Sequence, residues 1–251
     1  MSDRGRFVAD TFCGVGKVGR SVERRGFGAR FYDILIDPLE GDMTREKNIR
    51  YLVSCANTGK LIGIMLAPVC SSWSQARHRT NVIRSYESPW GLPFALRKKP
   101  FSENDQKALD IGNKTMSSAF RLAKAVHRCG VPWILENPFT SICWQTEEAK
   151  ALANMANVSW VVVDFCHFGT DWRKRTGLLI GNCDSVDIES LRKCRCQGVG
   201  VCSYTGKKHI QLTGSDPTGI PWTKRAEPYP TRLASRMGHM LLHRELVGRR
   251  R

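Results

Sequence analysis

Short apolar runs alternate along the chain with segments whose apolar residues recur at helical spacing. The runs typical of buried strands lie at residues 7–10, 29–34, 61–67, 132–136, 160–165 and 177–180. Helical spacing is found over residues 44–56, 102–128, 146–157 and 231–246, and a further helix begins at a glycine-rich turn after the first strand. Strands and helices that alternate in this way predict an α/β fold with a mostly parallel sheet and helices on both faces.

Several of these elements carry start and stop signals. Ser102 and Asp105 form an N-capping signal at the start of the longest helix, and Gly130 follows its end. The third strand stops at Pro68, and residues 69–101 then form a long basic loop with turn signals. Loops of this length inside a compact domain are usually functional or mobile.

The chain divides into three segments without an internal repeat or a low-complexity linker. Residues 1–182 hold the alternating strands and helices, and residues 183–222 are an insertion rich in cysteine, histidine and glycine. Residues 223–251 contain a helix that returns to the core and a basic tail. We therefore predict one α/β domain with a small Cys/His-rich insertion.

The charge balance adds a class of partner to this picture. Lys and Arg number 39 against 23 Asp and Glu, which gives a net charge of +16 with neutral histidines. Such an excess indicates a polyanionic partner, and nucleic acid, either DNA or RNA, is the first candidate. The alternative is a basic surface without a specific ligand.

Hydropathy and cysteine usage bear on the compartment. No apolar run approaches the ~18 residues of a membrane-spanning helix, and the N-terminus lacks the apolar stretch of a signal peptide. We expect an intracellular chain, in nucleus or cytoplasm, that does not enter a membrane and for which a monomer is favoured. Ten cysteines in such a chain indicate thiols, a metal site or a nucleophile rather than disulfides.

The glycine-rich turn after the first strand is a candidate ligand site. Gly14 and Gly16 allow the backbone to approach a ligand closely at the carboxyl end of the sheet. Asp33 ends the second strand, where a carboxylate can accept ribose hydroxyls, and Asp42 follows nearby, where it suits an adenine amino group. The alternative is a plain strand-to-helix turn in which both aspartates are turn or cap residues.

A second group of side chains converges on three neighbouring strand ends. Cys70 lies just past a buried strand, and Glu136 lies at the end of the next one. Arg173 and Arg175 occupy alternate positions, so both point the same way from an extended backbone. A lone cysteine after a strand is more often structural. The thiol, the acid and the arginine pair together favour a catalytic site.

The order and content of these motifs resemble the cytosine-C5 methyltransferases. The signature of that family runs D-x-F-x-G-x-G, P-P-C-x-x-x-S, E-N-V and Q-x-R-x-R. The matching segments are residues 10–16, 68–74, 136–138 and 171–175, and the resemblance covers residues 7–181 with a looser echo in the last helix.

This resemblance implies a Rossmann-like class I methyltransferase that transfers a methyl group from S-adenosylmethionine to C5 of cytosine in DNA or RNA. Cys70 would be the nucleophile, Glu136 would hold the base at N3, and Arg173 and Arg175 would contact the base carbonyl and a phosphate. The residues that would bind S-adenosylmethionine are Asp10, Phe12, Gly14, Gly16, Asp33, Asp42 and Pro68.

The chain also departs from the family pattern. Val69, Pro138 and Asp171 replace the family's proline, valine and glutamine. Only nine positions separate Asp33 from Asp42, so the helix that usually lies between them is missing. The large target-recognition region is missing as well, which makes this a reduced form. These departures leave open an alternative function, a catalytically silent nucleic-acid-binding module with a methyltransferase fold.

The insertion contains a candidate metal site. Cys194, Cys196, Cys202 and His209 provide three thiols and an imidazole within sixteen residues, which is a full ligand set for tetrahedral Zn²⁺. Cys183 is an alternative ligand, and reduced, unliganded cysteines in a loop are the alternative to zinc. Basic residues surround this set, so the insertion is a candidate substrate-recognition element.

Overall fold

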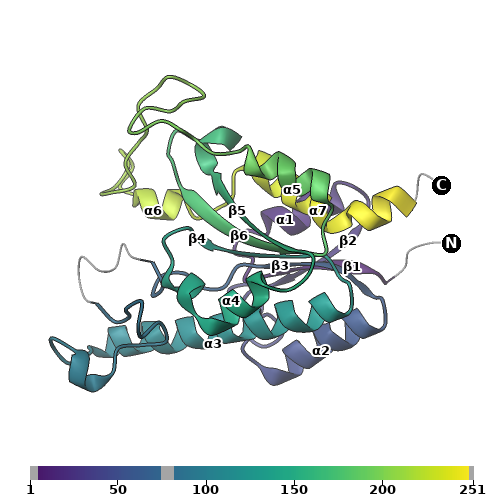
Figure 1. Ribbon diagram of the computed structural model, residues 1–251, viewed down its shortest axis with the longest axis horizontal. Coiled ribbons are helices and arrows are strands. Elements are labelled where there is room, and N and C mark those ends of the chain that lie inside the picture. Colours follow the sequence, from purple (N-terminus) through teal and green to yellow (C-terminus); the bar gives the residue numbers. More distant parts are fainter. Residues whose placement is uncertain (1–4, 75–81, 249–251) are drawn as a thin grey trace.

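The computed structural model describes residues 5–74 and 82–248. Its centre is a six-stranded sheet with the strand order β2-β1-β3-β4-β6-β5 (Figure 1). The strands are β1 (Phe7–Thr11), β2 (Gly28–Tyr32), β3 (Leu61–Leu66), β4 (Trp133–Pro138), β5 (Val158–Asp164) and β6 (Arg175–Gly181). The α-helices are α1 (Lys17–Glu23), α2 (Glu46–Asn57), α3 (Glu103–Arg128), α4 (Glu147–Ala153), α5 (Ser185–Arg192), α6 (Trp222–Arg225) and α7 (Thr231–Gly248). Short 3₁₀ turns are η2 (Phe94–Leu96), η3 (Ile142–Gln145) and η4 (Phe165–Phe168).

The sheet is mixed, which corrects the expectation of a mostly parallel one in one respect. Strands β2, β1, β3 and β4 are parallel neighbours, whereas β6 runs antiparallel to both β4 and β5. The connection from β5 to β6 spans only residues 165–174. A parallel crossover needs about a dozen residues or more, usually with a helix, so this short connection reverses the chain instead.

Two apolar layers cover the sheet, and β3 shows why its sequence is continuously hydrophobic. Helices α2, α3 and α4 cover one face of the sheet, and α1, α5 and α7 cover the other (Figure 1). Ile64 and Leu66 belong to the apolar cluster on the first face, whereas Ile62 and Met65 belong to the cluster on the second. Both faces of the strand are therefore buried, and alternation with polar residues is lost. None of the helices within the described ranges is long and apolar enough to cross a membrane.

Local signals fixed some helix ends and missed others. The Ser102 hydroxyl accepts from the Asp105 N–H at 3.1 Å, and the Asp105 carboxylate accepts from the Ser102 N–H at 3.1 Å, so the predicted capping box forms. The helix predicted over 146–157 ends at Ala153, and α5 within the insertion was not predicted.

The strand order gives the sheet a topological switch point between β1 and β3. Strand β1 lies between β2 and β3, so the connections that follow β1 and β3 leave the sheet on opposite sides. Ligands of open α/β sheets bind outside the carboxyl ends of strands at such a switch point. The glycine-rich turn follows β1 there and Cys70 follows β3, so the fold brings the two candidate sites to one edge.

Candidate active site

Asp33 holds the glycine-rich turn in place. Gly14 has φ 52° and Gly16 has φ 64°, left-handed conformations that favour glycine. The Gly14 N–H donates to Asp33 Oδ2 at 2.8 Å, and the Leu35 N–H donates to Asp33 Oδ1 at 3.0 Å. Each carboxylate oxygen has two lone pairs, so Asp33 keeps the capacity to accept further hydrogen bonds from a ligand.

Asp10 supports the same turn from inside the protein. Its buried Oδ2 accepts from the Gly19 N–H at 2.8 Å in the first helical turns of α1. Burial raises the pKa of Asp10 to about 7; the Gly19 hydrogen bond opposes this shift and the charge of Asp33 adds to it. Phe12 is partly buried against the core and has φ 54°, an unusual backbone conformation for this residue type.

Asp42 has the turn role that the sequence left open. Its Oδ1 accepts from the Thr44 N–H at 2.9 Å and from the Thr44 hydroxyl at 2.7 Å, just before α2. The residues between Asp33 and Asp42 form turns rather than a helix, as their number predicts. Four apolar side chains of this segment are exposed, namely Ile34, Leu35, Ile36 and Leu39.

Cys70 lies at the mouth of the sheet in a tight turn. Its carbonyl oxygen accepts from the N–H groups of Trp73 and Ser74 at 3.0 Å each. Burial raises the pKa of the Cys70 thiol, the charge of Glu136 raises it further, and Lys174 acts in the opposite direction. Lys174 is thus a cation that acts on this thiol, but the net shift of the Cys70 pKa is upward.

Glu136 is buried on β4, the strand next to β3. The Tyr229 hydroxyl donates to Glu136 Oε2 at 3.0 Å, whereas Oε1 is buried without a hydrogen-bond partner among the described residues. Burial raises the pKa of Glu136, and Lys174 and the Tyr229 hydrogen bond reduce that shift. Glu136 therefore offers a carboxyl group that tends to keep its proton and has one unsatisfied oxygen.

Tyr229 and Lys174 are site residues that sequence reasoning missed. Tyr229 precedes α7, and Lys17 donates to its carbonyl oxygen at 2.8 Å, which ties this segment to the start of α1. The Lys174 ammonium donates to Ala226 O at 3.2 Å and lies 4.9 Å from the ring centre of Phe165. The proline on either side of Tyr229 is its only local signal, because its partner Glu136 is distant in sequence.

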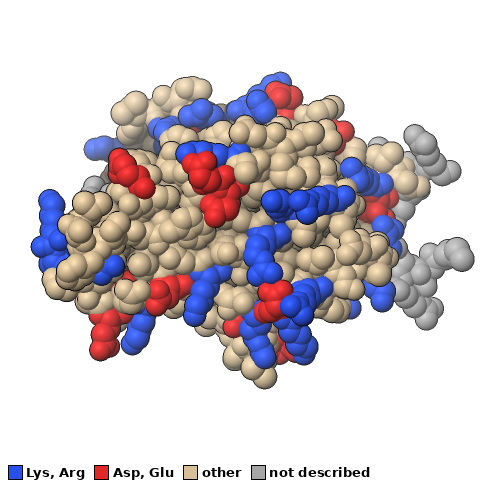
Figure 2. Space-filling model, turned by 60° about the horizontal axis from the view of Figure 1, so that its bottom comes forward, with Lys and Arg blue, Asp and Glu red and all other residues tan. Residues whose placement is uncertain are grey.

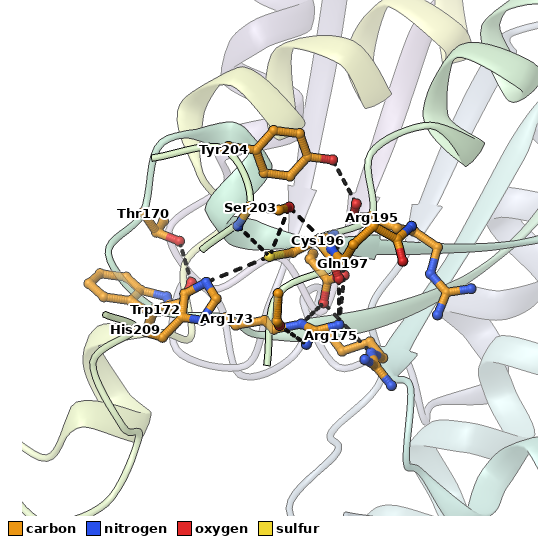
Figure 3. Close-up of polar contacts among 12 residues, drawn as sticks. Thr170, Trp172, Arg173, Arg175, Arg195, Cys196, Gln197, Ser203, Tyr204 and His209 are labelled. Carbon is orange, nitrogen blue, oxygen red and sulfur yellow. Dashed lines mark hydrogen bonds and ion pairs between the residues drawn. The ribbon is translucent and has the colours of Figure 1, made fainter. Parts of the chain in front are cut away.

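Arg173 and Arg175 face the same way, as their spacing predicts, but toward Asp164 at the end of β5 (Figure 3). Arg173 Nε donates to the fully buried Asp164 at 2.9 Å, and its Nη atoms donate to Gly198 O at 2.9 Å and Cys196 O at 2.8 Å. These donors are occupied, so the expected contact of Arg173 with a base is not supported. A buried carboxylate requires a paired cation, and Arg173 supplies it.

Arg175 lies farther from Asp164 than Arg173 does. Its Nε lies 3.7 Å from Asp164 Oδ1, and its guanidinium lies 5.2 Å from the ring centre of Phe139, just after β4. Lys174, between the two arginines, instead donates to Ala226 O and acts electrostatically on Cys70 and Glu136. The cation that lowers the Cys70 pKa is therefore Lys174, not one of the two arginines that the sequence predicts for the site.

A buried cysteine–histidine cluster lies beside these arginines. The potential ligand atoms of four residues lie within 4.8 Å of one another and could hold a metal ion: Cys166, Cys196, Cys202 and His209. Cys194, which the sequence spacing placed in the set, lies outside it, where its thiol donates to Ser190 O at 3.4 Å. Cys183 also packs elsewhere, against the layer that contains α7. Cys166 was missed because it belongs to η4, outside the insertion.

An open aromatic groove lies next to the candidate active site. It has a volume of about 550 Å³ and includes Tyr86, Trp144 and Trp160 in its lining. The rings of Trp144 and Trp160 pack edge to face with centres 4.6 Å apart. Ser141 of the lining forms an isolated β-bridge with Ser74, and the next residue, Ile142, donates its N–H to Trp73 O at 2.9 Å, so this side of the groove is joined to the turn that holds Cys70.

Comparisons with known proteins find distant structural likeness but no match in sequence. No protein-family model matches the chain, and no curated protein sequence matches it significantly. The chain is similar to a solved structure of the Entamoeba histolytica methyltransferase EhMeth, with 11% sequence identity and a TM-score of 0.40. The match covers 86% of this chain and 64% of EhMeth, so this chain spans less than two thirds of that protein. A likeness at this identity and TM-score carries no argument about function, which therefore has to be argued from the residues of the site.

Proposed function

We propose that the chain is a methyltransferase that uses S-adenosylmethionine to methylate C5 of cytosine in nucleic acid. The observation that carries this proposal is that Cys70, just past β3, and Glu136, on the neighbouring strand β4, interact electrostatically on the same edge of the sheet as the glycine-rich turn. The order of the four sequence motifs supports the same activity.

The two side chains suit the chemistry of cytosine. C5 is a poor nucleophile, so the Cys70 thiolate first forms a bond to C6 and an electron pair moves toward C5. Glu136 donates its proton to N3, which stabilises the adduct. C5 then bonds to the methyl group as the methyl–sulfonium bond of the cofactor breaks. A water molecule takes the C5 proton, the C6–sulfur bond breaks to release the Cys70 thiolate, and N3 returns its proton to Glu136. When bound, S-adenosylmethionine supplies the methyl group in electrophilic form.

Burial of Glu136 favours both the protonated acid and the Cys70 thiolate that this mechanism requires. The raised pKa of its carboxyl group favours the protonated form, which is the hydrogen-bond donor that N3 requires. A neutral Glu136 also removes the negative charge that raises the Cys70 pKa, so the protonated acid and the thiolate favour each other. Lys174 adds a positive charge that stabilises the thiolate further.

The glycine-rich turn fits S-adenosylmethionine. Gly14 is exposed, and a Cβ built on it would meet no atom within 4 Å, so space for a ligand is open above the turn. Asp33 lies at the same turn with acceptor capacity for ribose hydroxyls. Asp33 and Gly14 are therefore the residues that would hold the cofactor most directly, whereas Gly16 is buried against the Phe31 ring and Asp42 is engaged by Thr44. The family resemblance adds Phe12 and Pro68.

Nucleic acid fits the net charge of +16. Lys and Arg alternate with Asp and Glu over the face shown in Figure 2 rather than forming one unbroken basic patch. Phosphate binding there would use separate cations, and the aromatic groove offers surfaces on which bases can stack. The target base itself must leave its stack to reach Cys70, as in other enzymes that modify bases.

The test is transfer of a labelled methyl group. The chain is incubated with methyl-labelled S-adenosylmethionine and single-stranded DNA, duplex DNA or structured RNA, and the modified nucleosides are identified. Label on C5 of cytosine that Cys70→Ala abolishes supports the proposal, with the exposed Cys129→Ala as matched control. Label on adenine, or label that persists in Cys70→Ala, contradicts it. Nucleic-acid binding without any transfer would favour the catalytically silent module.

A further inference from the structure

The geometry of the cysteine–histidine cluster matches tetrahedral zinc. Cys196 Sγ and His209 Nε2 are 3.9 Å apart, and all four potential ligand atoms lie within 4.8 Å of one another. Zinc–sulfur bonds of about 2.3 Å in a tetrahedron place neighbouring ligand atoms about 3.8 Å apart. Because the side chains already meet at nearly this spacing, a small contraction completes the coordination shell.

The surroundings of Cys196 favour a metal-bound thiolate. Its sulfur receives the N–H of Ser203 at 3.3 Å and the hydroxyl of Ser203 at 3.4 Å (Figure 3). Donors of this kind orient and stabilise the ligands of metal sites. The chain between Cys196 and His209 folds back on itself, with Cys202 N–H bonded to Lys207 O and His209 N–H bonded to Gly200 O, each at 2.8 Å.

The cluster joins the insertion to the core. Cys166 lies in η4, two residues after β5, whereas the other three ligands belong to the insertion. The buried carboxylate of Asp164 accepts from the Cys196 N–H at 2.9 Å, and Arg173 links Asp164 to the carbonyl oxygen of Cys196. The ligands therefore lie on two segments that already contact each other through charged and backbone groups.

We propose that Cys166, Cys196, Cys202 and His209 bind one Zn²⁺ ion that fastens the insertion to the end of β5. All four residues are buried and fill a four-coordinate shell, so the site is closed and structural rather than catalytic. The segment from 194 to 221 contains few apolar residues, and burial alone contributes little to offset its ordering entropy. This inference goes beyond the proposed methyl transfer and does not depend on it.

The experiment measures metal content and ligand identity. The chain is purified without chelators and its zinc is quantified; we expect one zinc ion per chain. Cys166→Ser is expected to lose zinc, whereas Cys194→Ala is the matched control and is expected to retain it. A metal-free chain that also fails to take up Co²⁺ under reducing conditions overturns the proposal. Loss of zinc in Cys194→Ala with retention in Cys166→Ser overturns the ligand set.

A second measurement covers the case in which Cys166→Ser does not fold. X-ray absorption at the zinc edge of the unmodified chain is expected to give three sulfur ligands at about 2.3 Å and one nitrogen ligand at about 2.0 Å. Cys194→Ala is expected to give the same spectrum. Any other ligand count, or a changed spectrum in Cys194→Ala, contradicts the assignment of Cys166.

Discussion

The Tyr229 hydroxyl donates a hydrogen bond of 3.0 Å to the buried carboxylate oxygen Oε2 of Glu136, across 93 positions of sequence. This contact brings the segment before α7 to the end of β4 and occupies one oxygen of Glu136. The other oxygen, Oε1, is left without a partner among the described residues. The arrangement fixes the acid that we propose to contact N3 of the base.

Tyr229→Phe tests this arrangement. Removal of the hydroxyl leaves Oε2 unsatisfied and takes away a hydrogen bond that lowers the pKa of Glu136, so that pKa is expected to rise further. If protonated Glu136 is the active form, the alkaline limb of the pH profile of methyl transfer moves to higher pH. The stability is expected to fall by about 1–3 kcal/mol. An alkaline limb that moves to lower pH would contradict the role of this hydrogen bond.

Replacement of Glu136 tests its coupling to the thiol. Ionised Glu136 raises the Cys70 pKa, so at alkaline pH, where Glu136 has lost its proton, Glu136→Gln is expected to lower that pKa and to speed alkylation of Cys70 by iodoacetamide. Lys174→Gln is expected to slow the same reaction, because its ammonium acts in the opposite direction. Methyl transfer by Glu136→Gln is expected to fall by about 10²–10⁴-fold. Equal alkylation rates in all three chains would contradict the electrostatic account.

Arg173 is expected to act on stability rather than on base recognition. Arg173→Ala leaves the fully buried Asp164 without its cation and is expected to cost about 3–5 kcal/mol in the free energy of unfolding, measured with urea. Arg175→Ala serves as the comparison, since its Nε lies 3.7 Å from the same carboxylate and a smaller loss is expected. A stable Arg173→Ala chain with weakened cytosine binding would restore the role implied by the family resemblance.

The raised pKa of Asp10 predicts that the stability of the chain depends on pH. The pKa of Asp10 in the folded chain is about 7, above the ordinary value of 3.8, so the folded state binds more protons than the unfolded state between these values. Stability is therefore expected to increase as the pH falls through 7 toward 3.8. Asp10→Asn keeps an acceptor for the Gly19 N–H and is expected to remove this contribution. The difference between the unfolding free energies of the two chains across this pH range checks it, and a constant difference would contradict it.

The aromatic groove predicts a contribution to nucleic-acid affinity. Tyr86→Ala removes a lining ring, and stacking of a base on an aromatic side chain is worth about 1–3 kcal/mol. The dissociation constant for single-stranded nucleic acid is therefore expected to rise roughly 5- to 150-fold. Tyr51→Ala, an exposed tyrosine of α2 outside the groove lining, is the control. Equal affinities of the two variants would exclude the groove as a stacking surface.

The parts of the fold that depend on local pattern could be predicted from the sequence. The apolar runs located all six strands, and Ser102 with Asp105 located the start of α3. The neighbouring positions of Cys70 and Glu136 followed from the order of the strands. These features depend on neighbouring residues or on the order of adjacent parallel strands, so the pattern of apolar and polar residues is enough to predict them.

The remaining features depend on contacts between distant segments. Tyr229 reaches Glu136 only because α7 packs beside α1, and Cys166 joins the cluster only because the insertion folds back onto β5. The Arg173 guanidinium is bound by Asp164 because that carboxylate is buried, and the sequence of β5 does not show this burial. Each of these is a long-range or burial effect that residue spacing does not encode.

The most direct test of the proposed activity is to trap the adduct between Cys70 and its substrate. Oligonucleotides that contain 5-fluorocytosine are incubated with the chain and S-adenosylmethionine. Fluorine at C5 cannot leave as a proton does, so the C6–sulfur bond persists after methyl transfer. We expect a covalent complex that survives denaturation, with mass spectrometry locating the methylated fluorocytosine on Cys70. A complex through another cysteine, or no complex with DNA or RNA under conditions in which the chain binds both, would contradict the account.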